Sequence, residues 1–253
     1  MSSKVPRSIS AVIPIYNEEQ ALIDAFPVIL KFLSDSFEEF EVIFVESGSR
    51  DGSRQVIERF CEASPGFVRA IFEGERRGFG SAVRAGFTAA KCETVYLQPI
   101  DVCFPLTALL EAARNLKDNA SVLSFRTHDP RGWYRRLQSI VFNLICRLLF
   151  RIQLKHVNSA LKLHRTTFIR SLPLQENGWL VDLEVVYYVV QSRARFTEIG
   201  APYIERLSGV SSIRFATCVF IMRDILRFWL RVNLANSDKK LESVVSLLGL
   251  RRH

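Results

Sequence analysis

The first half of the chain alternates between short apolar runs and longer segments whose apolar residues recur at helical spacing. The runs are typical of buried strands, and they cover Ile9 to Ile15, Phe40 to Glu46, Phe67 to Glu73, Thr94 to Leu97 and Ala120 to Phe125. The segments between them predict helices over Glu18 to Ser34, Gln55 to Ala63, a stretch ending at Ala90, and Pro105 to Leu116. Because strands and helices alternate, we expect an α/β fold with an open, mostly parallel sheet flanked by helices.

The second half has longer helical patterns and more arginine. Arg131 to Leu154 predicts a basic and apolar helix, or a pair of helices, and Ser212 to Val232 predicts a strongly amphipathic one. Further elements are expected as helices at Thr166 to Ser171, Leu180 to Ser192 and Leu241 to Leu248, and as strands at Val157 to Leu163 and Arg195 to Tyr203. We place a domain boundary near Glu205, between an α/β domain (1–205) and a C-terminal amphipathic helical segment (206–253) that is too short to fold alone.

Composition is that of a globular protein: 48% of the 253 residues are hydrophobic and 24% are charged. No stretch of about 18 apolar residues lacks charge, so the sequence predicts no membrane span. The N-terminus does not resemble a signal peptide. Five cysteines are scattered without a CxxC pair, which indicates reduced thiols rather than a zinc site. We therefore expect a cytoplasmic protein.

The formal net charge is +8, and the basic residues are mostly arginines after position 126. Such a surface is either a solvated basic face or a binding surface for an anion, such as phosphate groups or an anionic membrane. No basic stretch interleaves aromatic residues as in single-strand binders, so we expect no nucleic-acid partner.

Polar, acid-bearing loops follow the first two predicted strands. They contain Pro14, Tyr16, Glu18, Glu46, Ser47 and Asp51. The carboxyl ends of parallel strands are where an open α/β sheet binds a ligand. The Glu18 carboxylate could accept hydrogen bonds from a ligand, while Pro14 and Tyr16 offer a flat apolar wall. The alternative is a surface loop in which Asn17 caps a helix.

Ordered motifs occur along the chain from about Ser8 to Arg231. They are Val12 to Glu18, Val45 to Ser53, Gly78 to Phe87, Ser124 to Arg126, Trp133 to Asn143, Lys155 to Leu163, Gly178 to Glu184 and Ile204 to Ser212. Together they resemble the family 2 glycosyltransferases, and within them the polyprenyl-phosphate (dolichyl-phosphate) hexose synthase branch. The resemblance implies a Rossmann-like GT-A fold, a nucleotide-sugar donor, a polyprenyl-phosphate acceptor and inversion at the anomeric carbon.

The resemblance assigns the donor to the first half of the chain. It implies that Pro14, Tyr16 and Glu18 contact the base and ribose. It also implies that Glu46 and Ser47 belong to the nucleotide loop, although many family members carry aspartates at both positions. Asp51 in the same loop is either a ligand contact or only a helix cap.

A glycine-rich turn is expected to approach the donor with its backbone. Gly78 and Gly80 precede a helix whose N-terminus favours anions. The chain departs from the family here, because Arg76 and Phe79 replace an asparagine and a lysine. Two polar contacts to the donor are therefore in doubt.

The metal motif departs furthest from the family. Family members carry Asp-x-Asp after the fourth strand, which holds Mg²⁺ or Mn²⁺ against the diphosphate. Here Gln98 takes the first position and Ile100 the second, with Asp101 one residue later. Either Asp101 serves as a lone metal ligand, or metal binding is weak or lost.

The acceptor side is expected in the second half of the chain. The resemblance places Arg126 and Arg136 at the acceptor phosphate, and Arg206 closing over phosphate; a guanidinium fork suits that contact. A charged phosphate oxygen needs little help from a base. If the acceptor were a sugar hydroxyl, Asp182 or Glu184 would be the candidate base.

Arginines follow two apolar helical patterns. Arg223, Arg227 and Arg231 recur every four residues, and Arg147 and Arg151 repeat the pattern upstream. This spacing is typical of helices that lie on an anionic membrane, which predicts a peripheral protein on the cytoplasmic face. The alternatives are a core helix with a solvated arginine stripe, or a contact between copies in a homo-oligomer.

Two other functions are compatible with parts of the sequence. The altered positions Phe79, Gln98, Ile100 and His156 favour a catalytically weak or inactive member that binds a nucleotide-sugar or a partner at the membrane. A dinucleotide-binding oxidoreductase is disfavoured, because the glycines do not follow the first strand.

Overall fold

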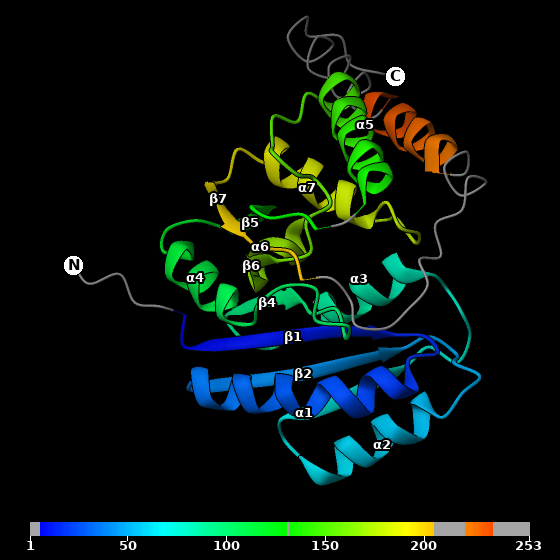
Figure 1. The fold of residues 1–253 in the computed structure, drawn as a ribbon, viewed down its shortest axis with the longest axis vertical. Coiled ribbons are helices and arrows are strands. Elements are labelled where there is room, and N and C mark those ends of the chain that lie inside the picture. The colour runs from blue at the N-terminus through cyan, green and yellow to red at the C-terminus, as the bar shows by residue number, and fades with distance from the viewer. Residues whose placement is uncertain (1–5, 131, 205–220, 235–253) are drawn as a thin grey trace, which may run out of the picture. The chain divides into compact units, whose positions relative to one another are not determined.

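The computed structural model describes residues 6–130, 132–204 and 221–234 (Figure 1). The chain divides into two compact units, residues 1–208 and 209–253. Residues 221–234 of the second unit form a helix. The boundary predicted near Glu205 stays a prediction, because residues 205–220 lie outside the described part. None of the described helices is both long and apolar enough to span a bilayer.

The first unit is an α/β fold, as predicted. Its strands are β1 (Ser8–Ile15), β2 (Glu39–Glu46), β3 (Val68–Phe72), β4 (Thr94–Leu97), β5 (Ser121–Arg126), β6 (Lys162–Arg165) and β7 (Phe196–Ala201). Its helices are α1 (Glu19–Ser36), α2 (Ser53–Ala63), α3 (Phe79–Ala89), α4 (Thr107–Leu116), α5 (Trp133–Phe150), α6 (Thr166–Ser171) and α7 (Val181–Gln191).

The seven strands form one sheet in the order β3-β2-β1-β4-β6-β5-β7. Neighbours are parallel except for β6, which is antiparallel to both β4 and β5. The carboxyl ends of six strands and the amino end of β6 therefore lie along one edge. In an open α/β sheet, this edge is where ligands bind.

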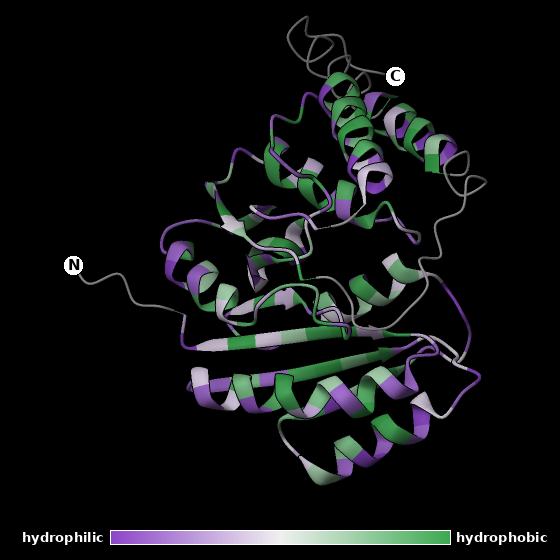
Figure 2. Ribbon diagram, in the orientation of Figure 1, coloured by the Kyte–Doolittle hydropathy of each residue, from purple (hydrophilic) through white to green (hydrophobic). Residues whose placement is uncertain are grey.

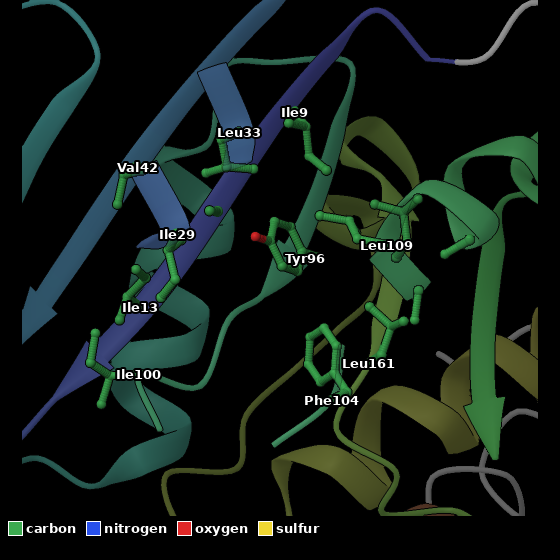
Figure 3. Packing of buried hydrophobic residues seen from close by; sticks show 14 of the residues in the cluster. Ile9, Ile13, Ile29, Leu33, Val42, Tyr96, Ile100, Phe104, Leu109 and Leu161 are labelled. Carbon is green, nitrogen blue, oxygen red and sulfur yellow. The ribbon is translucent and has the colours of Figure 1, made fainter. Parts of the chain in front are cut away.

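The main hydrophobic core lies between one face of the sheet and helices α1 and α4. Alternate residues of β1, from Ile9 to Ile15, point into it, as the two-residue period of a strand requires. Figure 3 shows Tyr96 of β4 among these side chains, with Ile29 of α1 and Leu109 of α4 nearby. Burial raises the pKa of the Tyr96 hydroxyl far above its usual range.

The opposite face of the sheet is covered in part by α3. Gly86 of α3 lies directly against Val12 of β1, and a Cβ at this glycine would collide with the valine side chain. This close approach brings the start of α3, and the glycine turn before it, to the ligand-binding edge.

One predicted strand begins later than expected, and one of the two alternatives for the basic helical pattern is confirmed. The strand expected at Val157 to Leu163 forms only from Lys162 onward, because the Val157 N–H bonds to the Asn143 side chain instead of to a neighbouring strand. The basic pattern from Arg131 gives one helix, α5, which ends at Phe150 with Arg151 in a left-handed conformation (φ 56°). The predicted helix at Ser212 to Val232 is described only from residue 221 onward, and Leu241 to Leu248 lies outside the described residues.

Candidate active site

The loops after β1 and β2 cap each other's helices. Ser53 Oγ accepts a hydrogen bond from the Glu18 N–H (2.9 Å), and Asp51 accepts from the backbone N–H groups of Glu19 (3.2 Å) and Ser53 (3.0 Å). In return, the Glu19 carboxylate accepts from the Gly52 N–H at 2.9 Å. Burial works to raise the pKa of Asp51, but the bonds from Ser53 and Glu19 outweigh it and lower that pKa. Asp51 is therefore a helix cap in this structure.

Tyr16 lies at the mouth of these loops. The Arg76 guanidinium carbon is 4.2 Å from the centroid of the Tyr16 ring, which is a cation–π contact. Pro14 is half-buried in β1, whereas Glu18 is exposed. The predicted base and ribose contacts are thus accessible to a ligand, and Arg76 joins them from the loop after β3.

Glu46 and Ser47 are buried and bonded within the protein. Glu46 accepts a hydrogen bond from the Ser49 N–H, so its carboxylate binds the backbone of its own loop. Ser47 Oγ donates to Glu73 Oε2, and Ser81 Oγ donates to Glu73 Oε1, both at 2.7 Å. Glu73 therefore ties the β2 loop to the first turn of α3.

The glycine turn before α3 is packed against the chain itself. The Gly80 N–H donates to the Asn177 carbonyl oxygen at 2.8 Å. A Cβ at Gly78 would collide with Asn177, and one at Gly80 would collide with Glu176. Gly78 has φ +102°, which favours glycine. These glycines thus make room for the loop before α7, a role that the predicted phosphate contact did not include.

The segment after β4 contains the residues at the metal-motif positions. Gln98 is fully buried; its Nε2 donates to the Pro99 carbonyl oxygen at 2.7 Å, and its Oε1 has no hydrogen-bond partner among the described residues. Ile100 packs into the core, and Asp101 is half-buried. Val102 has φ 41°, an uncommon conformation for a β-branched residue. Strain of this kind clusters at functional sites.

Arg126 ends β5 and lies at the same edge of the sheet. Its guanidinium donates to the Asn158 carbonyl oxygen (2.8 Å) and to Ser139 Oγ of α5 (3.4 Å), and its backbone N–H donates to His156 Nδ1 (3.0 Å). Arg136 lies on α5 about one turn before Ser139, and its side chain is exposed. Residues of the predicted acceptor motifs are thus joined around Arg126.

Asp182 and Glu184 begin α7 but have different surroundings. Asp182 Oδ1 lies 2.8 Å from Lys162 Nζ, at the amino end of β6. Glu184 is fully buried, and its oxygens accept hydrogen bonds from the backbone N–H groups of Gln175 and Glu176 at 2.8–2.9 Å. Asp182 remains a candidate base, whereas Glu184 holds the loop before α7. Arg206 lies outside the described residues.

The sequence profile of glycosyl transferase family 2 matches residues 10–175, well over half of the chain. The chain belongs to glycosyl transferase family 2. This family 2 chain therefore carries a glycosyltransferase domain, and the resemblance inferred from the motifs is confirmed.

Similar sequences include two transferases named for lipid-phosphate acceptors. The chain is 25% identical over 221 residues to an undecaprenyl-phosphate 4-deoxy-4-formamido-L-arabinose transferase of Proteus mirabilis, covering 86% of the chain and 66% of that relative. It is 25% identical over 244 residues to a dolichyl-phosphate β-glucosyltransferase of Drosophila melanogaster, covering 88% and 74%. The chain thus spans just under two thirds of the length of the first relative.

Solved glycosyltransferases share the fold. Glucosyl-3-phosphoglycerate synthase of Mycobacterium tuberculosis, in complex with uridine diphosphate, matches with a TM-score of 0.62 at 18% identity, over 91% of this chain and 81% of that one. A mannosyltransferase of Pyrobaculum calidifontis, in complex with GDP-Man and Mn²⁺, matches with a TM-score of 0.59 at 19% identity, over 81% and 58%. The predicted GT-A fold is confirmed.

Whether a divalent cation suits this family 2 chain depends on the end of β4. No group of three or more His, Cys, Asp or Glu side chains that could hold a metal ion occurs among the residues that the structure describes. The Asp101 carboxylate and the Gln98 amide oxygen are oxygen ligands of the kind that Mg²⁺ and Mn²⁺ accept. Mg²⁺ is commonly held by one or two carboxylates together with substrate phosphates. In donor type, the Gln98 oxygen, unpartnered in the described part of the chain, and the half-buried Asp101 carboxylate match a cation that arrives with a diphosphate, although Gln98 would have to become accessible to it.

Three residues in well-defined contacts lie within the motifs, but the motifs assign them no role of their own. They are Lys162, Arg84 and Trp179. The glycines would have suggested a close approach of another segment, since only glycine leaves room for one. The partner segment, residues 175–178, carries no such signal.

Proposed function

We propose that this chain transfers a sugar from a nucleotide-sugar to a polyprenyl phosphate, with inversion at the anomeric carbon. The observation that carries the proposal is that one edge of the sheet holds both the exposed nucleotide-type loop, with Tyr16 and Glu18, and the anchored arginine Arg126. The names of the two similar transferases support a lipid-phosphate acceptor.

The acceptor needs positioning more than activation. A phosphate monoester has a second pKa of about 6, so its oxygen is already charged at neutral pH and can attack the anomeric carbon directly. Arg126 is held by Ser139 and Asn158, which fixes the direction of its guanidinium. Arg126, with Arg136, is proposed to orient the phosphate by charge-assisted hydrogen bonds.

The departing nucleoside diphosphate gains negative charge as its bond to the sugar breaks. A bound Mg²⁺ or Mn²⁺ would offset that charge. On the protein side, Asp101 and Gln98 would hold such a cation. Arg76 lies over the Tyr16 ring and adds positive charge near the loop after β1, where the donor is proposed to bind. These groups lower the barrier by being placed before the reaction, not by rearranging during it.

We propose that two helices contact the membrane, α5 and the helix formed by residues 221–234. Figure 2 shows hydrophobic residues along most of α5. The exposed apolar face of α5 comprises Trp133, Tyr134, Leu137, Ile140, Val141, Leu144 and Leu148. The helix 221–234 exposes Met222, Leu226, Leu230 and Leu234 beside Arg223, Arg227 and Arg231. Large exposed apolar faces next to arginines suit the headgroup region of an anionic leaflet.

A second candidate function is binding of a nucleotide-sugar without efficient transfer. It is favoured by the end of β4, where Gln98 and Ile100 stand at the motif positions of the two metal-binding aspartates and both are buried. Such a protein would bind the donor but would turn it over poorly.

Turnover assays decide between the two. The purified full chain is incubated with labelled UDP-glucose or GDP-mannose and polyprenyl phosphate in detergent or liposomes, with Mn²⁺ or with a chelator. We expect a labelled lipid product with one donor, and a loss of about 100-fold or more for Arg126→Ala if two charge-assisted bonds to the phosphate are removed. Nucleotide binding without turnover of any donor would favour the second function.

The matched control is Arg59→Ala, which removes an exposed arginine of α2 and should leave turnover unchanged. Asp101→Ala tests the cation separately. If turnover with Mn²⁺ exceeds that with chelator in the wild type but not in Asp101→Ala, Asp101 holds the cation. Equal turnover under all four conditions would contradict a role for the metal.

A further inference from the structure

An exposed tryptophan lies between the donor loops and the acceptor side. Trp179 is 63% exposed and stacks on Phe79 of α3, with ring centroids 5.0 Å apart and an interplanar angle of 20°. Phe79 stands where the family carries a lysine, so this stack depends on one of the departures of the chain from the family. An exposed indole on a fixed partner is a preformed surface for another flat, partly apolar group.

The loop that carries Trp179 is held by three residues of two helices, α3 and α7. Glu184 binds the N–H groups of Gln175 and Glu176. Arg84 of α3 donates to the Glu176 carbonyl oxygen and to Asn177 Oδ1, the latter at 2.6 Å. The Gly80 N–H completes the contact through the Asn177 carbonyl oxygen. A side chain presented by a loop fixed in this way loses little conformational entropy when a ligand binds.

Both neighbours of this loop belong to the proposed site. On one side, Ser81 comes two residues after Phe79 in α3. Its hydroxyl and that of Ser47, in the predicted nucleotide loop, both donate hydrogen bonds to the Glu73 carboxylate. On the other side, Trp179 is three residues from Asp182, which pairs with Lys162. Trp179 therefore lies along the chain of contacts that connects the donor loops to the acceptor side.

We propose that Trp179 is the binding platform for the sugar ring of the donor. This inference rests on the proposed function. A pyranose presents C–H groups on its face and hydroxyls at its rim, so its face packs on an aromatic ring while its hydroxyls stay available to polar neighbours. Polar residues lie close to Trp179 along the chain, among them Asn177 and Asp182, whose side chains are held by Arg84 and Lys162.

A prenyl chain is the other occupant that an exposed aromatic could take. It would need a continuous apolar track, since each buried methylene contributes about 0.8 kcal/mol. Trp179 is the only exposed large hydrophobic residue described between 172 and 181. The extended apolar face lies on α5 instead, so the sugar fits Trp179 better.

Intrinsic fluorescence can report on this platform directly. The full chain has three tryptophans. Replacing Trp133 and Trp229 with phenylalanine leaves Trp179 as the only reporter. UDP, UDP-glucose, GDP and GDP-mannose are titrated as probes, and binding is measured in parallel by calorimetry. We expect the accepted nucleotide-sugar to change Trp179 emission, and its nucleoside diphosphate to bind with little change.

Affinity gives the second readout. Trp179→Ala should weaken binding of the nucleotide-sugar about fivefold to tenfold, the range expected for one aromatic contact, and leave the affinity for the nucleoside diphosphate within about twofold. Trp179→Phe should restore part of the loss. Phe67→Ala is the matched control and should change neither affinity. Phe67 is also exposed (52%) and stacks on another ring, that of Phe40, but it lies at the amino end of β3, away from the ligand-binding edge.

Variants of the supports test how the platform is held. Phe79→Lys, which restores the usual family residue, and Arg84→Ala should each lower the affinity for the nucleotide-sugar more than for the nucleoside diphosphate. Circular dichroism and thermal unfolding of each variant confirm that the fold is retained.

Three results would overturn the inference alone: equal loss of affinity for the sugar-bearing and sugar-free nucleotides in Trp179→Ala, no loss for either, or a Trp179 response to polyprenyl phosphate but not to the donor. Absence of binding by all four probes to the wild type would instead overturn the proposed donor, and this inference with it.

Discussion

Asp182 Oδ1 lies 2.8 Å from Lys162 Nζ, and the two side chains differ in exposure, at 30% for the aspartate and 6% for the lysine. Lys162 reaches this position because β6 runs antiparallel to β4 and β5, which brings its amino end to the ligand-binding edge. The carboxylate is therefore the more exposed member of an ion pair at this edge of the sheet. Such a pair can orient a base, or it can be purely structural.

Asp182→Asn separates the two acceptor classes. With a polyprenyl phosphate as acceptor, kcat/KM should fall less than about tenfold, because the attacking oxygen is already charged. With a sugar hydroxyl as acceptor, the loss should be about 100-fold to 10,000-fold, as for removal of a general base. The measurement is kcat/KM of the wild type and Asp182→Asn with each acceptor. A large loss with the phosphate acceptor would contradict the mechanism proposed for it.

Charge on the exposed face of α5 should release the protein from membranes. Ile140→Glu places a carboxylate on this face and should reduce binding to anionic liposomes about tenfold or more, because it removes an apolar side chain that the membrane would bury and adds repulsion. Flotation assays measure the bound fraction. Val28→Glu on α1 is the matched control, since Val28 and Ile140 are similarly exposed at 60% and 64%. Equal loss in both variants would argue against a specific role for α5.

The Glu41 carboxylate joins four segments at the opposite edge of the sheet. It accepts hydrogen bonds from Ser10 Oγ (2.6 Å), Arg69 Nε (2.9 Å) and the Lys91 N–H (2.5 Å). Burial works to raise the pKa of Glu41, but these bonds lower it below its ordinary value of 4.5. Glu41→Gln should lower the free energy of unfolding by about 2 kcal/mol at pH 7, since one end of a partly buried ion pair is lost.

The sign of the pH dependence follows from that lowered pKa. The stabilisation by Glu41 is present above about pH 4.5, the ordinary pKa of a glutamate, and is lost as the pH falls through the folded-state pKa. Urea unfolding of the wild type and Glu41→Gln should therefore differ most at neutral pH and converge in acid. A difference that stays constant down to pH 3 would show that packing, not charge, causes the loss.

His164 should make folding sensitive to mild acid. It is fully buried in β6 and lies 2.7 Å (Nδ1 to Oγ) from Ser121, and burial, together with the nearby Lys162 charge, lowers its pKa from 6.5 to about 3. Below pH 6.5 the unfolded chain binds a proton that the folded chain does not. This histidine should therefore reduce the free energy of unfolding by about 1.4 kcal/mol for each pH unit between those values.

His164→Gln tests this linkage. The variant should lose that part of the slope of unfolding free energy against pH between 6.5 and 5. The difference in free energy of unfolding between His164→Gln and the wild type at pH 7 measures separately how much the substitution disturbs the packing. A slope unchanged from the wild type would contradict burial of a neutral imidazole.

The order of strands and helices followed from the sequence because apolar periodicity is a local property. Ile9 to Ile15, for example, was predicted as a strand and lies within β1. Strand pairing is not local, and this is where prediction failed. Nothing in the residues from Val157 to Leu161 indicates that the Val157 N–H donates a hydrogen bond to the Asn143 side chain, or that β6 begins only at Lys162.

The candidate site shows the same division. The loop residues Tyr16 and Glu18 could be placed at the carboxyl end of a strand from the sequence. What each polar side chain binds could not be predicted, because a glutamate or aspartate is the same letter in the sequence whether its carboxylate meets a ligand or a backbone N–H. Only the folded structure shows that the two carboxylates differ. Glu184 accepts hydrogen bonds from the loop before α7, whereas Asp182 stays partly exposed.

The sequence by itself determined the α/β class and the family, and it predicted which loops bind the donor, since periodicity and ordered motifs are local features of the chain. The tertiary structure decided what the glycines before α3 are for, and that Phe79 meets Trp179. The physical reason is distance along the chain: the close contact between Gly80 and Asn177 joins residues that no local pattern relates, and it forms only when the sheet brings α3 and the start of α7 together.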